Sequence, residues 1–164
     1  MRRHFAVLVV GFASLLCIPT ALADKPQKFP LPAGPFQLPA AVCGVPIDLV
    51  PLQNNEFGKV FSNGTFAVSG ALKVRLTNSN TRKSVDLNIP GGGTIVPRSD
   101  GTALLTSHGP ALVFFLPGQL GPGSSGALLF VHGRFMEVLD QNGNPVPGTF
   151  TTTGSVEDLC PTLG

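Results

Sequence analysis

Hydrophobic and polar residues alternate along the middle of the chain with a period of two, which is typical of a β-strand with one buried face. The alternation is clear over residues 72–77 and returns over residues 84–89, after a polar connection of residues 78–83. A polar connection between two alternating runs predicts a β-hairpin. In this hairpin Arg75 and Asp86 would share the solvent-facing side, so that the charge pattern and the hydrophobic pattern agree.

Similar runs continue on both sides of this hairpin and are separated by residues that favour turns. Asn63-Gly64 and Asp100-Gly101 are strong signals for tight turns between antiparallel strands. The longest strand candidate covers residues 127–140, and Gly133 favours a β-bulge within it. No stretch of a dozen residues has the 3.6-residue period of a helix. We therefore expect an all-β fold, an antiparallel meander of about eight to ten short strands that forms a small sandwich or barrel.

Residues 1–23 are expected to be a signal peptide and not part of this fold. Residues 2–4 are basic, residues 5–18 are apolar, and the Ala-Leu-Ala of residues 21–23 matches the small-residue pattern of a cleavage site. The apolar stretch is too short for an ordinary transmembrane helix. The sequence thus predicts cleavage after Ala23, secretion of the product, and no integral membrane segment after cleavage.

Residues 24–41 form a proline-rich segment with apolar residues between the prolines. Proline at this density cannot donate hydrogen bonds to a sheet and favours extended chain. Two interpretations remain open at this point: the segment is an N-terminal tether, or its later part lies across the core. The β domain itself is expected to cover residues 42–164.

Composition narrows the range of partners. Only 12% of the residues are charged, and removal of Arg2 and Arg3 with the signal peptide leaves nine Lys and Arg against nine Asp and Glu. A neutral product lacks the positive charge with which proteins bind nucleic acids or anionic membranes. The chain contains no Trp and no Tyr, the residues that form most sugar-binding platforms and many protein hot spots. We therefore expect no nucleic-acid partner, and carbohydrate binding is disfavoured.

Cys43 and Cys160 are the two cysteines that remain after cleavage. One cysteine pair in an exported protein is most simply a disulfide. This disulfide would join the start of the β domain to its end.

Several segments of the mature chain resemble a family of small secreted proteins from high-GC Gram-positive bacteria. These segments are LPAAVCGVPIDL, KVRLTNSNTRKSVDLNIPGGGTIV, ALVFFL, GRFMEVLDQNGN and the terminal DLC. The motifs are turns, alternating strands and a cysteine pair, so the resemblance implies a secreted all-β protein. The family has no known activity, and the resemblance therefore implies no site residue.

His108 and His132 are the only histidines of the mature chain, and Glu137 and Asp140 lie further along the second predicted strand. Two histidines and a carboxylate could bind a metal ion if they converged. Nothing in their spacing enforces this convergence, so His108 and His132 are weak metal-site candidates. The sequence indicates no catalytic residue and no cofactor.

Three functional hypotheses follow. The first is a secreted, non-enzymatic β domain with a binding or extracellular structural role, whose partner is an extracellular protein or an apolar ligand. The second is a β-barrel that carries an apolar small molecule in a cavity lined by Phe114, Phe130 or Phe135. The third is a hydrolase or metal enzyme that uses His108 and His132.

Overall fold

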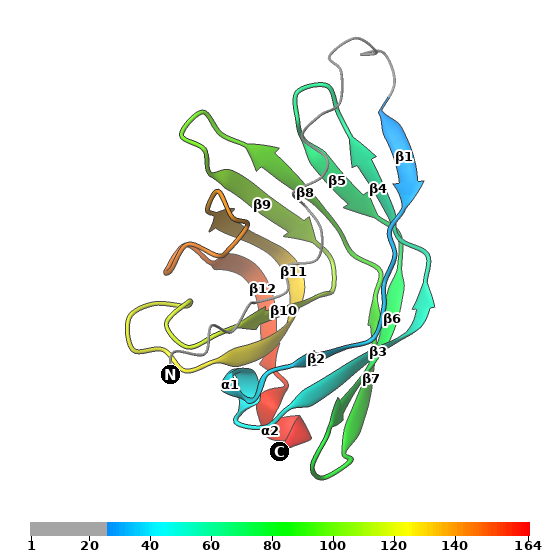
Figure 1. Cartoon of the computed structure of the whole chain (residues 1–164), viewed down its shortest axis with the longest axis vertical. Helices are drawn as coiled ribbons and strands as arrows, with labels where there is room; N and C mark the ends of the chain where they lie inside the picture. Colours follow the sequence, from blue (N-terminus) through cyan, green and yellow to red (C-terminus); the bar gives the residue numbers. More distant parts are fainter. Residues whose placement is uncertain (1–25) are drawn as a thin grey trace, which may run out of the picture.

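The computed structural model describes residues 26–164, which form two antiparallel β-sheets and two short helices (Figure 1). The larger sheet, sheet A, has the strand order β1-β4-β5-β8-β9-β11-β10, and β12 pairs with β11. The smaller sheet, sheet B, has the order β2-β3-β6-β7. The predicted all-β fold is confirmed. The predicted signal peptide and its cleavage site lie outside the described residues.

The strands of sheet A are β1 Gln27–Pro30, β4 Phe57–Val60, β5 Phe66–Ser69, β8 Gly92–Pro97, β9 Ala103–His108, β10 Ala111–Phe115, β11 Ala127–Leu139 and β12 Thr151–Asp158. The strands of sheet B are β2 Phe36–Leu38, β3 Ile47–Asn54, β6 Leu72–Asn78 and β7 Ser84–Ile89. The helices are α1 Ala40–Cys43 and α2 Cys160–Leu163. Neither helix of the described part is long and apolar enough to cross a membrane. Residues 26–164 thus contain β1 to β12, more strands than expected, and the chain changes sheet between successive hairpins.

The hairpin of β6 and β7 forms as its residue pattern predicts. Val74 and Leu76 are fully buried, and Arg75 between them lies opposite Asp86 on the outer face of sheet B. The Arg75 guanidinium donates two hydrogen bonds to the Asp86 carboxylate, with nitrogen–oxygen distances of 2.6 and 2.7 Å. The alternation of buried and exposed side chains therefore sets both the core and the surface ion pair of this hairpin.

The proline-rich segment is part of both sheets from residue 27 onward. β1 pairs with β4 at the edge of sheet A, and β2 pairs with β3 at the edge of sheet B. Leu38 in β2 is 1% exposed and belongs to the core. The tether interpretation is therefore wrong for residues 27–38. The prolines there are compatible with strands, because an edge strand tolerates a proline whose missing N–H faces away from the sheet.

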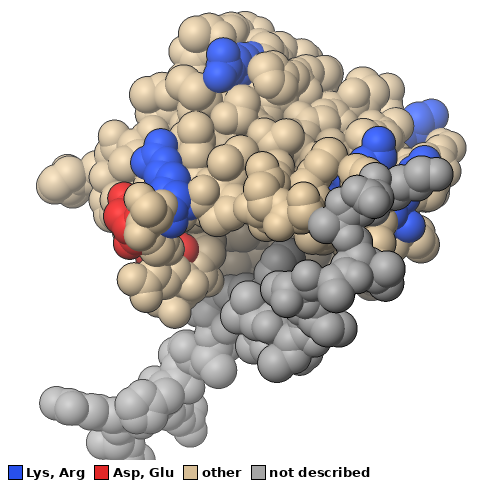
Figure 2. Space-filling model, turned by 90° about the horizontal axis from the view of Figure 1, so that it is seen from above, with Lys and Arg blue, Asp and Glu red and all other residues tan. Residues whose placement is uncertain are grey.

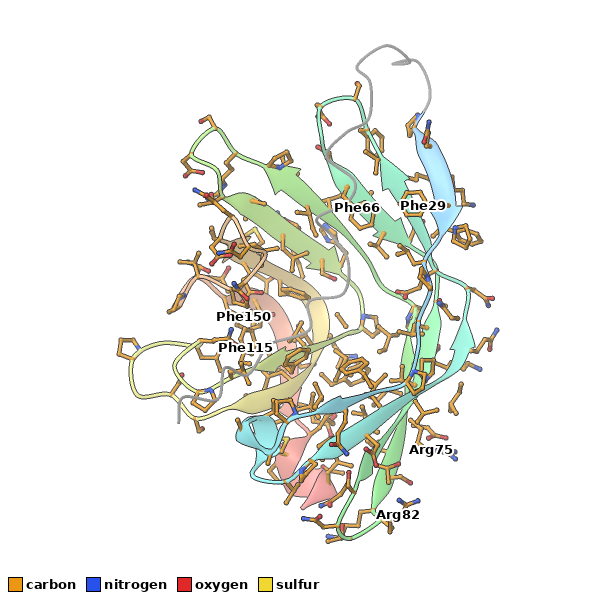
Figure 3. The ribbon with its side chains drawn as sticks, viewed as in Figure 1. Phe29, Phe66, Arg75, Arg82, Phe115 and Phe150 are labelled. Atoms are coloured by element: carbon orange, nitrogen blue, oxygen red, sulfur yellow. A yellow bond between two sulfur atoms is a disulfide. The ribbon has the colours of Figure 1, made fainter. Side chains whose placement is uncertain are left out.

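Two clusters of buried apolar side chains lie on opposite faces of sheet A. The first lies between the sheets, where Leu76 and Ile47 of sheet B pack with Leu128 of β11. The second lies on the other face of β10 and β11, where the Phe115 ring meets the edge of Phe150 at a centroid distance of 5.1 Å (Figure 3). β10 and the first half of β11 are therefore covered on both faces.

β9 and β10 follow one another along the same side of β11, and their register with β11 is the same before and after Gly133. The β-bulge expected at Gly133 is therefore absent. Gly133 instead has φ of 131° and lies opposite Gly154 of β12. A Cβ atom on Gly154 would lie 1.9 Å from the carbonyl oxygen of His132, so these backbones approach at a distance that only glycine permits.

The predicted disulfide between Cys43 and Cys160 is confirmed. It joins residues 117 positions apart, with a Cα–Cα distance of 5.1 Å. The two cysteines belong to α1 and α2, which lie side by side at one end of the molecule (Figure 1). The bond therefore fastens the segment between β2 and β3 to the helix that follows β12.

Candidate functional site

Sheet B covers only part of sheet A. The apolar cluster between the sheets takes side chains from β10 and β11 but none from β1, β4, β5, β8 or β9. In the described residues, none of these five strands contributes a fully buried hydrophobic side chain. The face of these strands that shares the side of Glu137 on β11 points away from sheet B, which packs on the side of Leu128 and Phe130, so no second sheet of the described residues lies against it.

A row of apolar side chains crosses this part of sheet A. Directly paired residues of antiparallel strands point to the same face. Val60 of β4 pairs with Phe66 of β5, Phe66 with Ile95 of β8, and Ile95 with Leu105 of β9. We call Val60, Phe66, Ile95 and Leu105 the apolar row. Its four side chains are half-buried.

The apolar row widens towards the edge of the sheet through β1. Phe29 of β1 and Phe66 have ring centroids 6.2 Å apart and an interplanar angle of 30° (Figure 3). Gly58 lies beneath both rings, since a Cβ atom there would lie 2.9 Å from each of them. Glycine at this position therefore lets two aromatic rings lie flat on the sheet.

Glu137 of β11 continues the apolar row, because it pairs directly with Leu105. Its neighbours on the same face of β11 are Phe135 and Leu139, and the side chain is 5% exposed. Desolvation by this burial raises the pKa of the Glu137 carboxyl to about 7. An acidic group thus lies at the end of an apolar surface.

The Glu137 carboxyl has no hydrogen-bond partner within residues 26–164. No side-chain nitrogen or oxygen of the described chain is both sealed from solvent and without a partner. The carboxyl oxygens of Glu137 must therefore keep some contact with solvent while the rest of the side chain is covered. They remain available to a hydrogen-bond donor from outside the protein.

The neighbouring strands β8 and β9 and residues 145–150 supply no countercharge to Glu137. The residues of β8 and β9 that share its face are Gly93, Ile95, Pro97, Ala103, Leu105 and Ser107. The chain after the β11 turn, residues 145–150, contains no charged residue. An ionised Glu137 would therefore be an isolated negative charge beside apolar side chains.

The opposite face of this part of sheet A is mixed, with apolar residues such as Phe57, Val96 and Leu104 beside charged ones. It carries Lys28 of β1, whose ammonium lies 4.0 Å from the centroid of the Phe57 ring, and Lys59 of β4. Farther along the sheet it carries His108 and Arg134, which pair directly. Seen from above, the charged residues are few and are separated by wide uncharged areas (Figure 2). The lysines of β1 and β4 thus lie on the face opposite to the apolar row, together with apolar residues of the same strands.

The structure does not bring the candidate metal ligands together. His108 and His132 both lie on the face of sheet A opposite to the one that carries Glu137. The His132 ring packs edge-on against Phe130 at a centroid distance of 4.3 Å. The Asp140 carboxylate accepts backbone hydrogen bonds within its own turn, and these bonds lower its pKa. Within residues 26–164, no three His, Cys, Asp or Glu side chains are placed to hold a metal ion.

The three phenylalanines expected to line a cavity lie in three different environments. Phe130 belongs to the cluster between the sheets, and Phe135 belongs to the cluster on the other face of sheet A. Phe114 is 45% exposed. These residues therefore do not line one common cavity.

A shallow pocket of about 420 Å³ lies beside the disulfide. Its lining residues are Ala41, Val42, Cys43, Gly44, Ser125, Gly126, Asp158, Cys160 and Pro161. The Asp158 carboxylate accepts a hydrogen bond from the backbone N–H of Cys160 at 3.0 Å, and both sulfur atoms are bonded to each other. The pocket therefore offers no free thiol as a nucleophile.

Sequence reasoning assigned no role to Glu137 beyond membership of a metal site. A usable signal was present, since Glu137 shares the parity of Leu129, Val131 and Phe135 along the strand. In an alternating strand this parity marks the apolar face. An acidic residue on the apolar face of a predicted strand is the feature by which the sequence alone could have indicated this site.

Comparisons of the chain with protein-family models, with curated proteins and with solved structures found no match. The function is therefore argued from the geometry above.

Proposed function

We propose that the protein is a secreted, non-enzymatic binding domain whose ligand is a small apolar molecule held against the apolar row. The observation that carries the proposal is the position of Val60, Phe66, Ile95 and Leu105, which form a continuous half-buried apolar strip on the face of sheet A opposite to sheet B, where Leu105 joins the strip to the buried cluster that contains Phe135. Contiguous half-exposed apolar residues on a small protein mark a binding surface more often than a structural one. This location replaces the barrel interior that the sequence suggested.

The placement of the polar groups supports binding over catalysis. The Asp100 and Asp140 carboxylates accept hydrogen bonds from the backbone of their own turns, and Asp86 is held by Arg75. These interactions lower the pKa of each carboxyl and stabilise local structure. The carboxylates of Asp86, Asp100 and Asp140 are thus engaged in shaping the fold.

The disulfide supports secretion, because disulfides form and persist in oxidising compartments. Expression in a secreting host should release into the medium a protein that begins at Asp24. N-terminal sequencing and intact mass measure this directly, and an uncleaved product retained in the cells would contradict the proposal.

Binding of a neutral fluorescent dye tests the apolar row. The emission of Nile red rises when the dye leaves water for an apolar surface, so that its binding can be followed by fluorescence. The purified protein should give a saturable increase in emission, and Phe66→Ser should weaken the affinity by roughly 10-fold or more, because a Phe side chain contributes roughly 1.5–3 kcal/mol on full burial.

Phe114→Ser is the matched control, since Phe114 is exposed on β10 and points away from the face of the apolar row. It should leave Nile red binding unchanged. Thermal unfolding of each variant shows that its fold is intact. An absence of saturable binding, or equal loss in both variants, would contradict the proposed function.

A further inference from the structure

The apolar row of the proposed function ends at the Glu137 carboxyl, a group that would select among apolar ligands. We infer that the ligand is an apolar molecule carrying one amino group, which the Glu137 carboxyl receives while the apolar body lies along Leu105, Ile95 and Phe66. The inference rests on the proposed function and names its ligand class.

Geometry is the first support. Glu137 pairs directly with Leu105, so that its carboxyl lies at the end of the apolar row and on the same face. Neighbouring strands in a sheet are about 4.8 Å apart. The step from β11 to β5 crosses β9 and β8, so an extended chain of about ten carbon atoms spans the distance from Glu137 to Phe66.

Hydrogen bonding is the second support. The carboxyl has no partner in the described chain, yet its oxygens retain contact with solvent. An apolar ligand without a donor would remove that contact and leave the group unpaired, which weakens binding. A ligand whose donor reaches the carboxyl avoids this cost, and a charged donor forms the stronger bond.

Charge complementarity is the third support. No cationic side chain of β8, β9 or residues 145–150 faces Glu137, so that an ammonium group would meet an unshared carboxylate. A carboxylate-bearing ligand would instead be repelled. A second copy of the protein, packed face to face, would bring two Glu137 side chains into one apolar interface, which disfavours a dimer at this surface.

Competition with three ligands of equal chain length tests the inference. Decylamine, decanol and decanoate, kept below their micelle-forming concentrations, are each used to displace Nile red at about pH 8, where the carboxyl is ionised. Decylamine should displace the dye at a concentration about 10-fold or more below that of decanoate. In Glu137→Gln the concentrations of decylamine and decanoate that displace the dye should differ by less than about 3-fold, while Nile red itself still binds.

Glu157→Gln is the matched control. Glu157 lies on β12 opposite Phe130, on the other face of the sheet, and is exposed. Its substitution should preserve the amine preference of the unmodified protein. Lowering the pH to about 5 should reduce the preference in the unmodified protein and leave Glu137→Gln unaffected.

The outcomes separate the two proposals. If Nile red does not bind saturably, the proposed function fails and the ligand class fails with it. If Nile red binds but the three decyl compounds displace it equally, or if Glu137→Gln keeps the amine preference, only the inference about the amino group is overturned.

Discussion

The two parts of sheet A are built from the same alternating pattern but differ in what lies against them. Around β10 and the first half of β11, sheet B and the loops cover both faces, and Leu128 and Val131 are 0% exposed. Across β4, β5 and β8, Phe66 and Ile95 remain half-buried. The first region holds most of the buried core, whereas the second carries the apolar row to which the proposed function assigns the ligand.

This comparison explains how a small domain can carry an open apolar surface. Burial of apolar side chains is the main favourable term in folding, and the two-layer region supplies it together with the disulfide. The one-layer region then needs little packing of its own, because its strands are held by backbone hydrogen bonds to β9 and β11. If the proposed function holds, stability and binding belong to different strands of one sheet.

Loss of the disulfide should have the largest effect, because the bond lies in the region that stabilises the fold. Replacing Cys43 and Cys160 together by Ser should lower the free energy of unfolding by roughly 2–5 kcal/mol. Chemical denaturation of the variant, compared with the oxidised parent, measures the change. A difference below about 1 kcal/mol would show that the two-layer region does not depend on this bond.

Truncation of one side chain in each region should reveal the contrast directly. Leu76→Ala empties a fully buried position between the sheets and should cost roughly 2–5 kcal/mol. Ile95→Ala removes a half-buried side chain from the apolar row and should cost about 1 kcal/mol. Urea denaturation of both variants gives the two values, and equal losses would abolish the distinction between the regions.

Glu137 should make stability depend on pH in an unusual direction. Burial raises the pKa of its carboxyl to about 7, against 4.5 for an unperturbed group. Between these values the unfolded chain loses the proton while the folded protein keeps it, so that stability falls as pH rises from 4.5 to about 7. The slope contributed by this group is at most about 1.4 kcal/mol per pH unit, and it levels off above that range.

Glu137→Gln should flatten this part of the pH profile. Glu56, whose carboxyl pKa is also raised by burial, contributes in the same direction and remains in the variant. The difference between the melting temperatures of the two proteins, measured across this range, isolates the contribution of Glu137. A difference in melting temperature that does not change with pH would show that Glu137 is not an unpaired buried acid.

The Arg75–Asp86 ion pair should have the smallest effect of these changes. Both side chains are about half exposed on the outer face of sheet B, where solvent screens their attraction. A double-mutant cycle with Arg75→Ala and Asp86→Ala should give a coupling smaller than the effect of Ile95→Ala. A larger coupling would mean that the outer face of sheet B contributes to stability as well as its core.

Local residue patterns predicted most of the strands, and distant packing decided the rest. The hairpin of β6 and β7 follows from alternation alone, and the link between Cys43 and Cys160 follows from their being the two cysteines outside the predicted signal peptide. The strand character of residues 27–38 was less accessible, because the prolines there disfavour a sheet unless an edge position is free. That position is created by β3 and β4, which come later in the chain.

The candidate site was predicted only in part for a similar reason. Alternation identifies which side chains share a face of one strand, but it does not identify which strands lie next to one another. β9 lies between β8 and β11 and so brings Ile95 close to Glu137. Phe66 joins them because β5 pairs with β8, although β6 and β7 separate these two strands in the sequence. The three phenylalanines proposed for a cavity were separated because Phe130 and Phe135 differ in parity along β11.

The bond between α1 and α2 also governs what a protease can do to this protein. Every loop from Gly44 to Leu159 lies inside the ring that the chain closes through Cys43 and Cys160. A single cut in any of these loops opens the ring without releasing a fragment, so that the two pieces migrate separately on a denaturing gel only after reduction. A protein nicked once between the two cysteines thus still diffuses as one molecule.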